Sequence, residues 1–204
     1  MFLRKYFFKQ KVGNFSYFIW NSEKKTISSV MDFKSLNIDL IIGADNQKKK
    51  ILENTINFAK GNFTNNALLW GARGNGKSSL IKAVFKSTLK DNKNLKLIQL
   101  NKNNIFDIEI MYQKFGQLKE YRIIIFIDDL SFEKIDSDYK IIKSVLDGSI
   151  QNQPSNILLY VTSNRRHLMP RDMIDNERSS AIHTDESVEE KISLSDRFGL
   201  WIGF

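Results

Sequence analysis

The 204-residue chain has the length of one moderate domain, and its 42% hydrophobic content is enough for a sizeable core. With no cysteine and only two histidines, it lacks the residues for a disulfide framework, a thiolate metal site or a histidine-rich zinc site, and we expect a reducing, cytoplasmic setting. The formal net charge is +8, and no apolar run approaches the roughly 18 residues of a membrane span, so we expect no membrane partner.

Residues 1–35 combine aromatic and basic residues, and we interpret them as an N-terminal extension of a core formed by residues 36–204. Residues 14–20 are expected to form a strand, and residues 26–31 a second strand after a turn. Residues 1–60 hold eleven Lys and Arg against five Asp and Glu, a net +6, and such a segment can attract nucleic acid. A solvated lysine-rich face, with the aromatic residues packed on the core, is the more ordinary interpretation.

The residues Ile41, Ile42 and Gly43 form an apolar turn ahead of a stretch with helical spacing, residues 47–60. An apolar pair before a glycine, just upstream of a glycine-rich loop, is a candidate shelf for an adenine ring, because adenine binds through its apolar faces and through backbone hydrogen bonds. An ordinary strand-to-helix turn explains the same residues equally well.

Residues 67–80 read ALLWGARGNGKSSL, in which a short apolar strand leads through a glycine-rich loop into a helix, residues 78–89. The loop fits G-x-x-x-x-G-K-[ST] at every fixed position. Glycines let backbone N–H groups approach a phosphate, and the positive end of the helix adds to the attraction. Lys77 supplies a charge for the β- and γ-phosphates of ATP, and Ser78 a hydroxyl for Mg²⁺. We assign nucleotide binding to Gly71, Ala72, Arg73, Gly74, Asn75, Gly76, Lys77, Ser78 and Ser79.

A second signal is the run YRIIIFI at residues 121–127, which is typical of a strand buried on both faces of a parallel sheet. Asp128 and Asp129 follow it. Downstream of a phosphate loop, the first acid of such a pair holds Mg²⁺ and the second polarises the attacking water. Two adjacent carboxylates repel each other, so a bound cation is a physical reason for the pair. We therefore assign Ser78 and Asp128 to the metal and Asp129 to catalysis.

The apolar patterns of residues 95–100 and 157–162 predict two more strands, and helical spacing predicts helices over residues 105–118 and 138–150. Asn164 comes just after the second of these strands. A polar side chain at that strand end can orient the hydrolytic water, although a turn-forming asparagine is the ordinary alternative.

The C-terminal part begins with a polar, irregular stretch, residues 170–187, for which we expect a long exposed loop. Residues 199–204 predict a final apolar strand. Arg197 lies just before that strand.

Taken together, these motifs resemble the core of AAA+ ATPases. Their order is an apolar-glycine box, the phosphate loop, the acidic strand end, a sensor-like Asn164 and an S-x-R-F-G-like box at residues 195–199. The strings LLWGARGNGKSSLIKA, DDLSFE, YVTSNRRHL and EEKISLSDRFGLW resemble one uncharacterised bacterial group specifically, the domain-of-unknown-function family eight-fifteen. The resemblance covers the chain from about residue 39 to its end, and more loosely the aromatic N-terminal segment.

The resemblance implies an α/β fold, a three-layer α/β/α sandwich around a parallel sheet with strand order 5-1-4-3-2. It also implies that Arg197 acts as an arginine finger in the active site of a neighbouring copy, which requires a homo-oligomer. A surface salt bridge of Arg197 is the ordinary alternative. AAA+ proteins continue past the fifth strand into a helical lid, which we expect to be missing from this chain.

Two functions are compatible with these residues. The first is an ATPase that uses Mg²⁺ and ATP to remodel a protein or nucleic-acid partner, with Asp129, Asn164 and Arg197 as catalytic residues. The second is a nucleotide-dependent binding switch, similar to a helicase loader, with little turnover. A P-loop GTPase is disfavoured, because residues 101–104 read NKNN and lack the acid of a guanine-reading loop. A small-molecule kinase fits less well, because Asn164 and the arginines after it suit a sensor better than a lid.

Overall fold

One seven-stranded sheet organises the computed structural model, which describes residues 12–132, 137–146, 153–166, 168 and 197–204. The order across the sheet is β2-β1-β4-β5-β6-β3-β7, and every neighbouring pair is parallel except β1 and β2. The strands are β1 (Tyr17–Asn21), β2 (Thr26–Ser29), β3 (Ala67–Trp70), β4 (Leu95–Leu100), β5 (Arg122–Ile127), β6 (Ile157–Ser163) and β7 (Leu200–Gly203).

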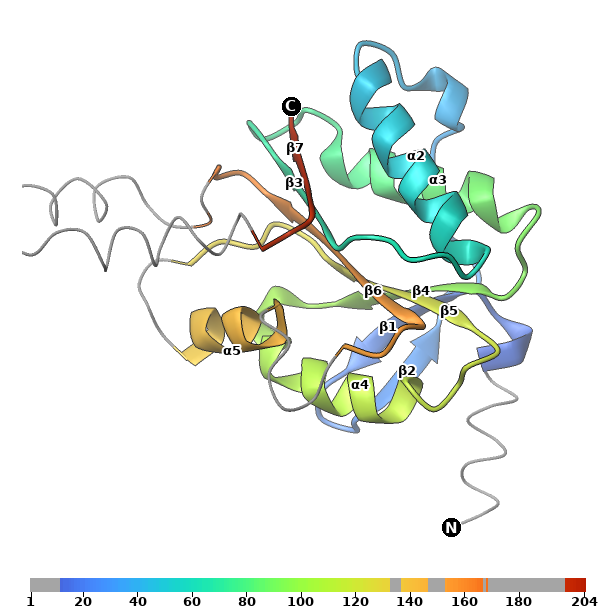
Figure 1. Ribbon diagram of the computed structural model, residues 1–204, viewed down its shortest axis with the longest axis vertical. Coiled ribbons are helices and arrows are strands. Elements are labelled where there is room, and N and C mark those ends of the chain that lie inside the picture. The colour runs from blue at the N-terminus through green and yellow to red at the C-terminus, as the bar shows by residue number, and fades with distance from the viewer. Residues whose placement is uncertain (1–11, 133–136, 147–152, 167, 169–196) are drawn as a thin grey trace, which may run out of the picture.

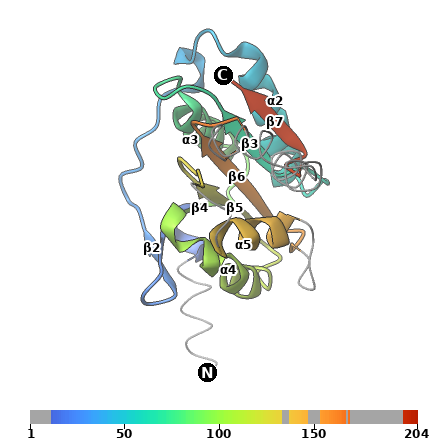
Figure 2. The same cartoon turned by 90° about the vertical axis from the view of Figure 1, so that its left-hand side faces the viewer.

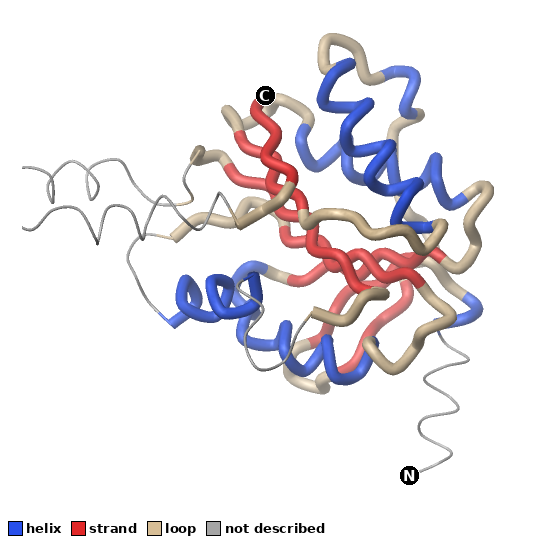
Figure 3. Tube along the Cα trace, viewed as in Figure 1, coloured by secondary structure: helices blue, strands red, loops and turns tan. Residues whose placement is uncertain are grey.

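Helices cover both faces of this sheet, which gives three layers (Figures 1 and 3). α2 and α3 pack on one face and enclose an apolar cluster that includes Phe58, Phe85 and Phe126. α4 and α5 pack on the other face over a second cluster that includes Phe115. The helices are α2 (Asp45–Ala59), α3 (Lys77–Leu89), α4 (Ile108–Phe115) and α5 (Ser137–Leu146), with short 3₁₀ turns at η1 (Ile38–Leu40) and η2 (Lys102–Asp107).

The predicted strand order is confirmed for the five strands expected to build the core. Numbered in chain order, β7, β3, β6, β5 and β4 follow one another as 5-1-4-3-2. β5 pairs with β4 on one side and β6 on the other, and its side chains from residue 123 to 127 are buried, which explains its nearly continuous apolar sequence.

The sheet also contains two strands that the predicted order did not include. β1 runs parallel to β4, with Tyr17 opposite Leu97, and β2 turns back antiparallel to β1 (Figure 1). Figure 2 shows β2 on the outer side of the molecule, away from β7. Both strands come from the aromatic N-terminal segment, so residues 17–29 are part of the sheet of the core. The domain boundary that we placed at residue 35 remains a prediction.

The β1–β2 hairpin is fastened to the core by one buried carboxylate, that of Asp107. The carboxylate accepts hydrogen bonds from Trp20 Nε1 at 2.7 Å and Ser22 Oγ at 2.5 Å. It also forms an ion pair with Lys25 Nζ at 2.5 Å. Asp107 ends η2, so the helix expected over residues 105–118 is split into η2 and α4. The sequence pattern did not predict the split, because the contacts around Asp107 are with residues more than 80 positions away.

Two further expectations reach beyond the described residues. The helix expected over residues 138–150 is present as α5 up to Leu146, and its last expected turn lies outside them. The exposed loop expected over residues 170–187 lies outside them entirely.

Candidate functional site

The glycine-rich loop joins β3 to α3, as the sequence predicts. Gly74 and Gly76 have φ of +87° and +83°, the left-handed region that glycine adopts without strain. A Cβ built on either glycine would meet no atom within 4 Å, so the loop surrounds open space. Gly76 is also the N-cap of α3, which directs the positive end of that helix into the same space. The cradle therefore has the shape and field that a phosphate chain requires.

Gly71 is required for a different reason. Its φ is +147°, and a Cβ there would lie 2.7 Å from the backbone oxygen of Phe204. The start of the loop thus packs directly against the end of β7, while the Gly71 N–H donates to the Ser163 carbonyl at 3.2 Å. Only a residue without a side chain allows β3, β6 and β7 to meet at this point.

Lys77 lies almost entirely inside the loop, with 6% of its surface exposed. Its Nζ donates to the carbonyls of Gly71 and Ala72, each at 2.7 Å, and to Asn164 Oδ1 at 3.2 Å. Burial lowers the pKa of Lys77, and the nearby carboxylates of Asp129 and Asp128 partly oppose that shift. The ammonium group is held by oxygen atoms that a phosphate can replace.

Ser78 and Asp128 are brought together as predicted. Ser78 Oγ donates to Asp128 Oδ1 at 2.5 Å, and Thr162 Oγ1 donates to the same oxygen at 2.6 Å. A hydroxyl and a carboxylate are hard oxygen ligands, which Mg²⁺ prefers when phosphates and waters complete its shell. Within the described ranges, no three His, Cys, Asp or Glu side chains gather as a metal cage.

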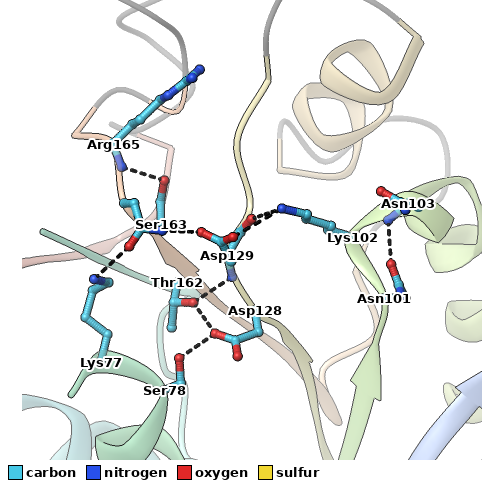
Figure 4. A network of polar contacts seen from close by, with 11 residues as sticks. Lys77, Ser78, Asn101, Lys102, Asn103, Asp128, Asp129, Thr162, Ser163 and Arg165 are labelled. Atoms are coloured by element: carbon cyan, nitrogen blue, oxygen red, sulfur yellow. Dashed lines mark hydrogen bonds and ion pairs between the residues drawn. The ribbon is translucent and has the colours of Figure 1, made fainter. Parts of the chain in front are cut away.

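The second acid, Asp129, has an unusual backbone, with φ of +56°. Its N–H donates to Thr162 Oγ1 at 2.9 Å, which links it to the neighbouring strand β6. The carboxylate accepts a hydrogen bond from Asn164 Nδ2 and forms an ion pair with Lys102 Nζ at 3.2 Å. The side chain is therefore turned toward the ends of β4 and β6, and Figure 4 shows it between Lys102 and Thr162.

These side chains line one pocket of about 330 Å³ at the carboxyl ends of β3, β5 and β6. Parallel strands bring those ends to one edge of the sheet, which is why residues 50 to 90 positions apart in sequence meet there. The lining consists of Arg73, Gly74, Gly76, Lys77, Ser78, Ser79, Asp128, Asp129, Thr162 and Asn164. Nine of these ten residues were expected from the sequence.

The adenine shelf is not part of that lining. Ile41 packs partly against the core cluster under α2 and α3, and its carbonyl accepts a hydrogen bond from Lys48 Nζ at 2.9 Å. Ile42 is 88% exposed, and Gly43 is exposed with φ of +80°. The role of these three residues in binding adenine remains a prediction.

Arg197 lies near the amino ends of the parallel strands, at the other end of the strands from the phosphate pocket. It precedes β7 and lines a separate pocket of about 570 Å³ with Arg122 at the start of β5. Since β7 runs parallel to β3, the beginning of β7 and the phosphate loop after β3 are at opposite ends of their strands. Arg197 therefore does not line the phosphate pocket of its own chain, and an action on a neighbouring copy remains a prediction.

Sequence reasoning missed two residues of the site, Lys102 and Thr162. Thr162 is the penultimate residue of β6 and looked like ordinary strand sequence. Lys102 follows β4, and β4 is the neighbour of β5 in the sheet. The expected strand order already contained this signal, because it places the ends of β4 and β5 side by side.

The fold is that of the AAA+ P-loop class, with helices on both faces of a mostly parallel sheet and a phosphate-loop motif between β3 and α3. Similar solved structures include the Thermotoga maritima RuvB Holliday junction branch migration motor, with a TM-score of 0.50 and 20% identity over 82% of this chain and 47% of that one. Others are C. elegans PCH-2, with a TM-score of 0.53 and 14% identity over 83% and 44%, and Aeropyrum pernix ORC1 in complex with DNA, with 0.50 and 15% over 82% and 49%. The chain spans about half the length of these structures, and at such identities the likeness concerns the fold.

The family is established by the sequence. Residues 13–204 match the family model described as "Protein of unknown function (DUF815)", so the chain belongs to that family. The comparison with curated proteins found no match. None of the helices within the described ranges combines the length and the apolar content needed to cross a membrane.

Proposed function

We propose that this chain binds ATP with Mg²⁺, hydrolyses it, and couples turnover to the remodelling of a partner. The observation that carries the proposal is the convergence of Lys77, Ser78, Asp128 and Asp129 on one pocket beside an open glycine cradle. Each of these groups has a distinct task in phosphoryl transfer, and they come from the ends of two different strands, β3 and β5.

The tasks follow from the contacts. Lys77 would exchange the carbonyls of Gly71 and Ala72 for the β- and γ-phosphates, keeping its charge next to the bond that breaks. Ser78 and Asp128 would hold Mg²⁺, which supplies positive charge to the phosphate oxygens. Asp129, steadied by Asn164, would orient the attacking water and accept its proton.

The proposal is tested by measuring ATP binding and phosphate release for the wild type and two variants. Lys77→Ala should weaken ATP binding about 10- to 100-fold, since a charged hydrogen bond is worth about 1.5–3 kcal/mol. Asp129→Asn keeps the size of the side chain but cannot accept a proton, so binding should persist while turnover falls by about 10²–10⁴. Lys86→Ala, on the exposed side of α3, serves as the control. Wild-type turnover in both site variants would contradict the proposal.

Assembly is part of the same proposal. Because Arg197 lies at the other end of the strands from the phosphate pocket, its role as an arginine finger needs a second copy of the chain in a head-to-tail contact. Turnover per chain should then rise with protein concentration, and Arg197→Ala should abolish that rise without weakening ATP binding. A turnover per chain that is the same at every concentration speaks against shared sites.

A second candidate function is a nucleotide-dependent switch with little turnover. It is favoured by one specific observation, that the carboxylate of Asp129 is already engaged by Lys102 and Asn164. A basic N-terminal portion with net +6 over residues 1–60 supports nucleic acid as the partner of such a switch, as does the likeness to a structure of ORC1 with DNA. Tight ATP binding with negligible turnover, and DNA binding that weakens with salt, would favour this second candidate.

A further inference from the structure

A cation stacked on two indole rings lies beside the phosphate loop. The guanidinium carbon of Arg166 is 5.2 Å from the ring centre of Trp70 and 4.9 Å from that of Trp201. The two rings are themselves 5.4 Å apart and inclined by 31°. A guanidinium within about 6 Å of an indole face is attracted by the ring quadrupole, and here two rings share one cation.

The two rings belong to the strands that frame the start of the phosphate loop. Trp70 ends β3 and is followed directly by Gly71, while Trp201 is on β7. In the register, Trp70 is opposite Gly203, and a Cβ on that glycine would come within 2.7 Å of the indole ring. The ring thus fills a space that only glycine leaves open. Its Nε1–H has no acceptor within the described ranges, so its position is set by packing and stacking rather than by a hydrogen bond.

Arg166 comes from the short segment that carries Asn164. On one side of that segment, Arg165 donates from its backbone N–H to Ser163 Oγ at 3.0 Å and from its guanidinium to the Phe132 carbonyl at 2.9 Å. On the other side, Arg166 crosses the end of β3 to reach the two tryptophans. Two consecutive arginines thereby hold the segment at two separate places.

The side-chain amide of Asn164 links two parts of the phosphate pocket, the phosphate loop at Lys77 and the end of β5 at Asp129. Its Oδ1 accepts from Lys77 Nζ at 3.2 Å, and its Nδ2 donates to the carboxylate of Asp129. Asn164 is itself exposed and has a short side chain, so its amide can occupy this place only if its backbone is held there.

We propose that Arg166, through its stack on Trp70 and Trp201, is a positioning residue that sets Asn164 between Lys77 and Asp129. The inference rests on the proposed hydrolysis. In that reaction Arg166 would touch neither the nucleotide nor the water and would act only through Asn164. A displacement of about 1 Å at a catalytic group can cost about 10² in rate, so a small shift of the segment is enough to matter. A planar guanidinium fits this stack better than an ammonium group does.

The kinetic test compares Arg166→Ala and Arg166→Lys with the wild type. Arg166→Ala should lower kcat about tenfold and leave KM for ATP within about twofold, because only the placement of Asn164 is lost. Arg166→Lys should restore part of the rate, since a lysine keeps a weaker cation–π contact. If Arg166 acted only by attracting the nucleotide, Arg166→Lys would equal the wild type and Arg166→Ala would raise KM. Either of those results overturns the proposal, and Lys140→Ala on the exposed side of α5 is the matched control for a lost positive charge.

A second measurement needs no nucleotide and separates this proposal from the proposed function. The side-chain amide signals of Asn164 in a ¹⁵N-labelled protein, identified by their loss in Asn164→Ser, report its surroundings directly. Arg166→Ala and Trp201→Leu should each shift these signals and leave those of Asn156, whose amide contacts Phe115 and Leu118, unchanged. Absence of turnover in the wild type would contradict the proposed hydrolysis but would leave the positioning of Asn164 by Arg166 untouched. Unchanged Asn164 signals in both variants would end the positioning role, whatever the wild type does.

Discussion

Lys102 Nζ lies 3.2 Å from a carboxylate oxygen of Asp129 and 3.0 Å from its backbone carbonyl, so one lysine holds both the side chain and the backbone of the candidate catalytic acid. The pair spans the ends of β4 and β5, and both side chains remain partly exposed, at 40% and 54%. In the proposed hydrolysis, the ammonium group of Lys102 would compete with the attacking water for this carboxylate oxygen.

The first prediction is that Lys102 restrains basal hydrolysis. Lys102→Met removes the charge and keeps the length of the side chain, so turnover without a partner should rise. Because partly exposed ion pairs are worth about 0.2–1 kcal/mol, the rise should not exceed about fivefold. Phosphate release at saturating ATP measures it, with Lys93→Met in the exposed turn before β4 as the control. A fall in turnover would mean that Lys102 assists the reaction rather than restrains it.

The phosphate loop could be predicted from sequence because all of its information is local. The glycines, Lys77 and Ser78 occupy fixed positions in one short loop, and the flanking strand and helix have clear apolar patterns. The same holds for β5, whose five consecutive apolar residues match its burial on both faces. Here the local sequence and the tertiary environment require the same residues.

The role of Lys102 could not be predicted in this way, because no local pattern distinguishes it from other loop lysines. Its importance arises from the adjacency of β4 and β5, which brings it to Asp129 across 27 positions of sequence. The same limit applies to Asp107, whose partners in the β1–β2 hairpin are more than 80 positions away. Polar contacts between distant strand ends follow from the order of the strands in the sheet, and the local sequence around each residue does not reveal them.

The second prediction concerns a pair of buried tyrosines. Tyr160 OH lies 3.0 Å from Asn54 Nδ2 and 2.9 Å from Thr55 Oγ1, whereas Tyr112 OH is buried with no hydrogen-bond partner within the described ranges. Burial raises the pKa of Tyr160 to about 12, so its hydroxyl is neutral at physiological pH. Tyr160→Phe leaves two buried polar groups on α2 short of a partner and should lower the free energy of unfolding by about 1–3 kcal/mol.

Tyr112→Phe is the matched control, because it removes a hydroxyl that has no hydrogen-bond partner among the residues that the structure describes. Its free energy of unfolding should stay the same or rise slightly. Urea unfolding of the two variants, followed by circular dichroism, gives both values. An equal loss in the two variants would mean that the hydroxyl contacts on α2 contribute nothing measurable.

The third prediction is that Asp107 fastens the hairpin in a pH-dependent way. Burial alone raises the pKa of its carboxyl, but the hydrogen bonds from Lys25, Ser22 and Trp20 outweigh burial and lower the pKa below the ordinary value. A lowered pKa means that the folded protein binds the proton less readily than the unfolded chain. The contribution to stability is therefore present above the ordinary pKa near 3.8 and is lost as the pH falls below it.

Asp107→Asn should remove this contribution and, because Lys25 is partly exposed and keeps access to water, destabilise the protein by about 1–3 kcal/mol near neutral pH. The difference in unfolding free energy between wild type and variant should shrink as the pH drops toward about 3. Thermal unfolding at several pH values measures this difference, and Asp91→Asn in an exposed turn controls for a lost charge. A difference that stays constant with pH would show that Asp107 acts by shape alone.

The last prediction concerns Lys77, which must carry its charge to bind a phosphate. Burial lowers its pKa from the ordinary value of 10.5, with the carboxylates of Asp129 and Asp128 acting in the opposite direction. The neutral form of Lys77 therefore appears at a lower pH than for an exposed lysine. Since bound phosphate favours the charged form, the dissociation constant of ATP should begin to rise above the lowered pKa of Lys77 in the free protein, and so below 10.5.

The variant Lys77→Arg separates this effect from general alkaline weakening. A guanidinium remains charged throughout the range, so whatever affinity the variant has should vary little with pH where the wild type loses affinity. Calorimetric titration of ATP at a series of pH values between about 8.5 and 10.5 measures both dissociation constants, above the range in which histidines and the α-amino group change charge. Parallel curves for wild type and variant would assign the alkaline loss to another group. A wild-type curve that rises alone would identify Lys77 as the titrating residue and place its ammonium group on the phosphates.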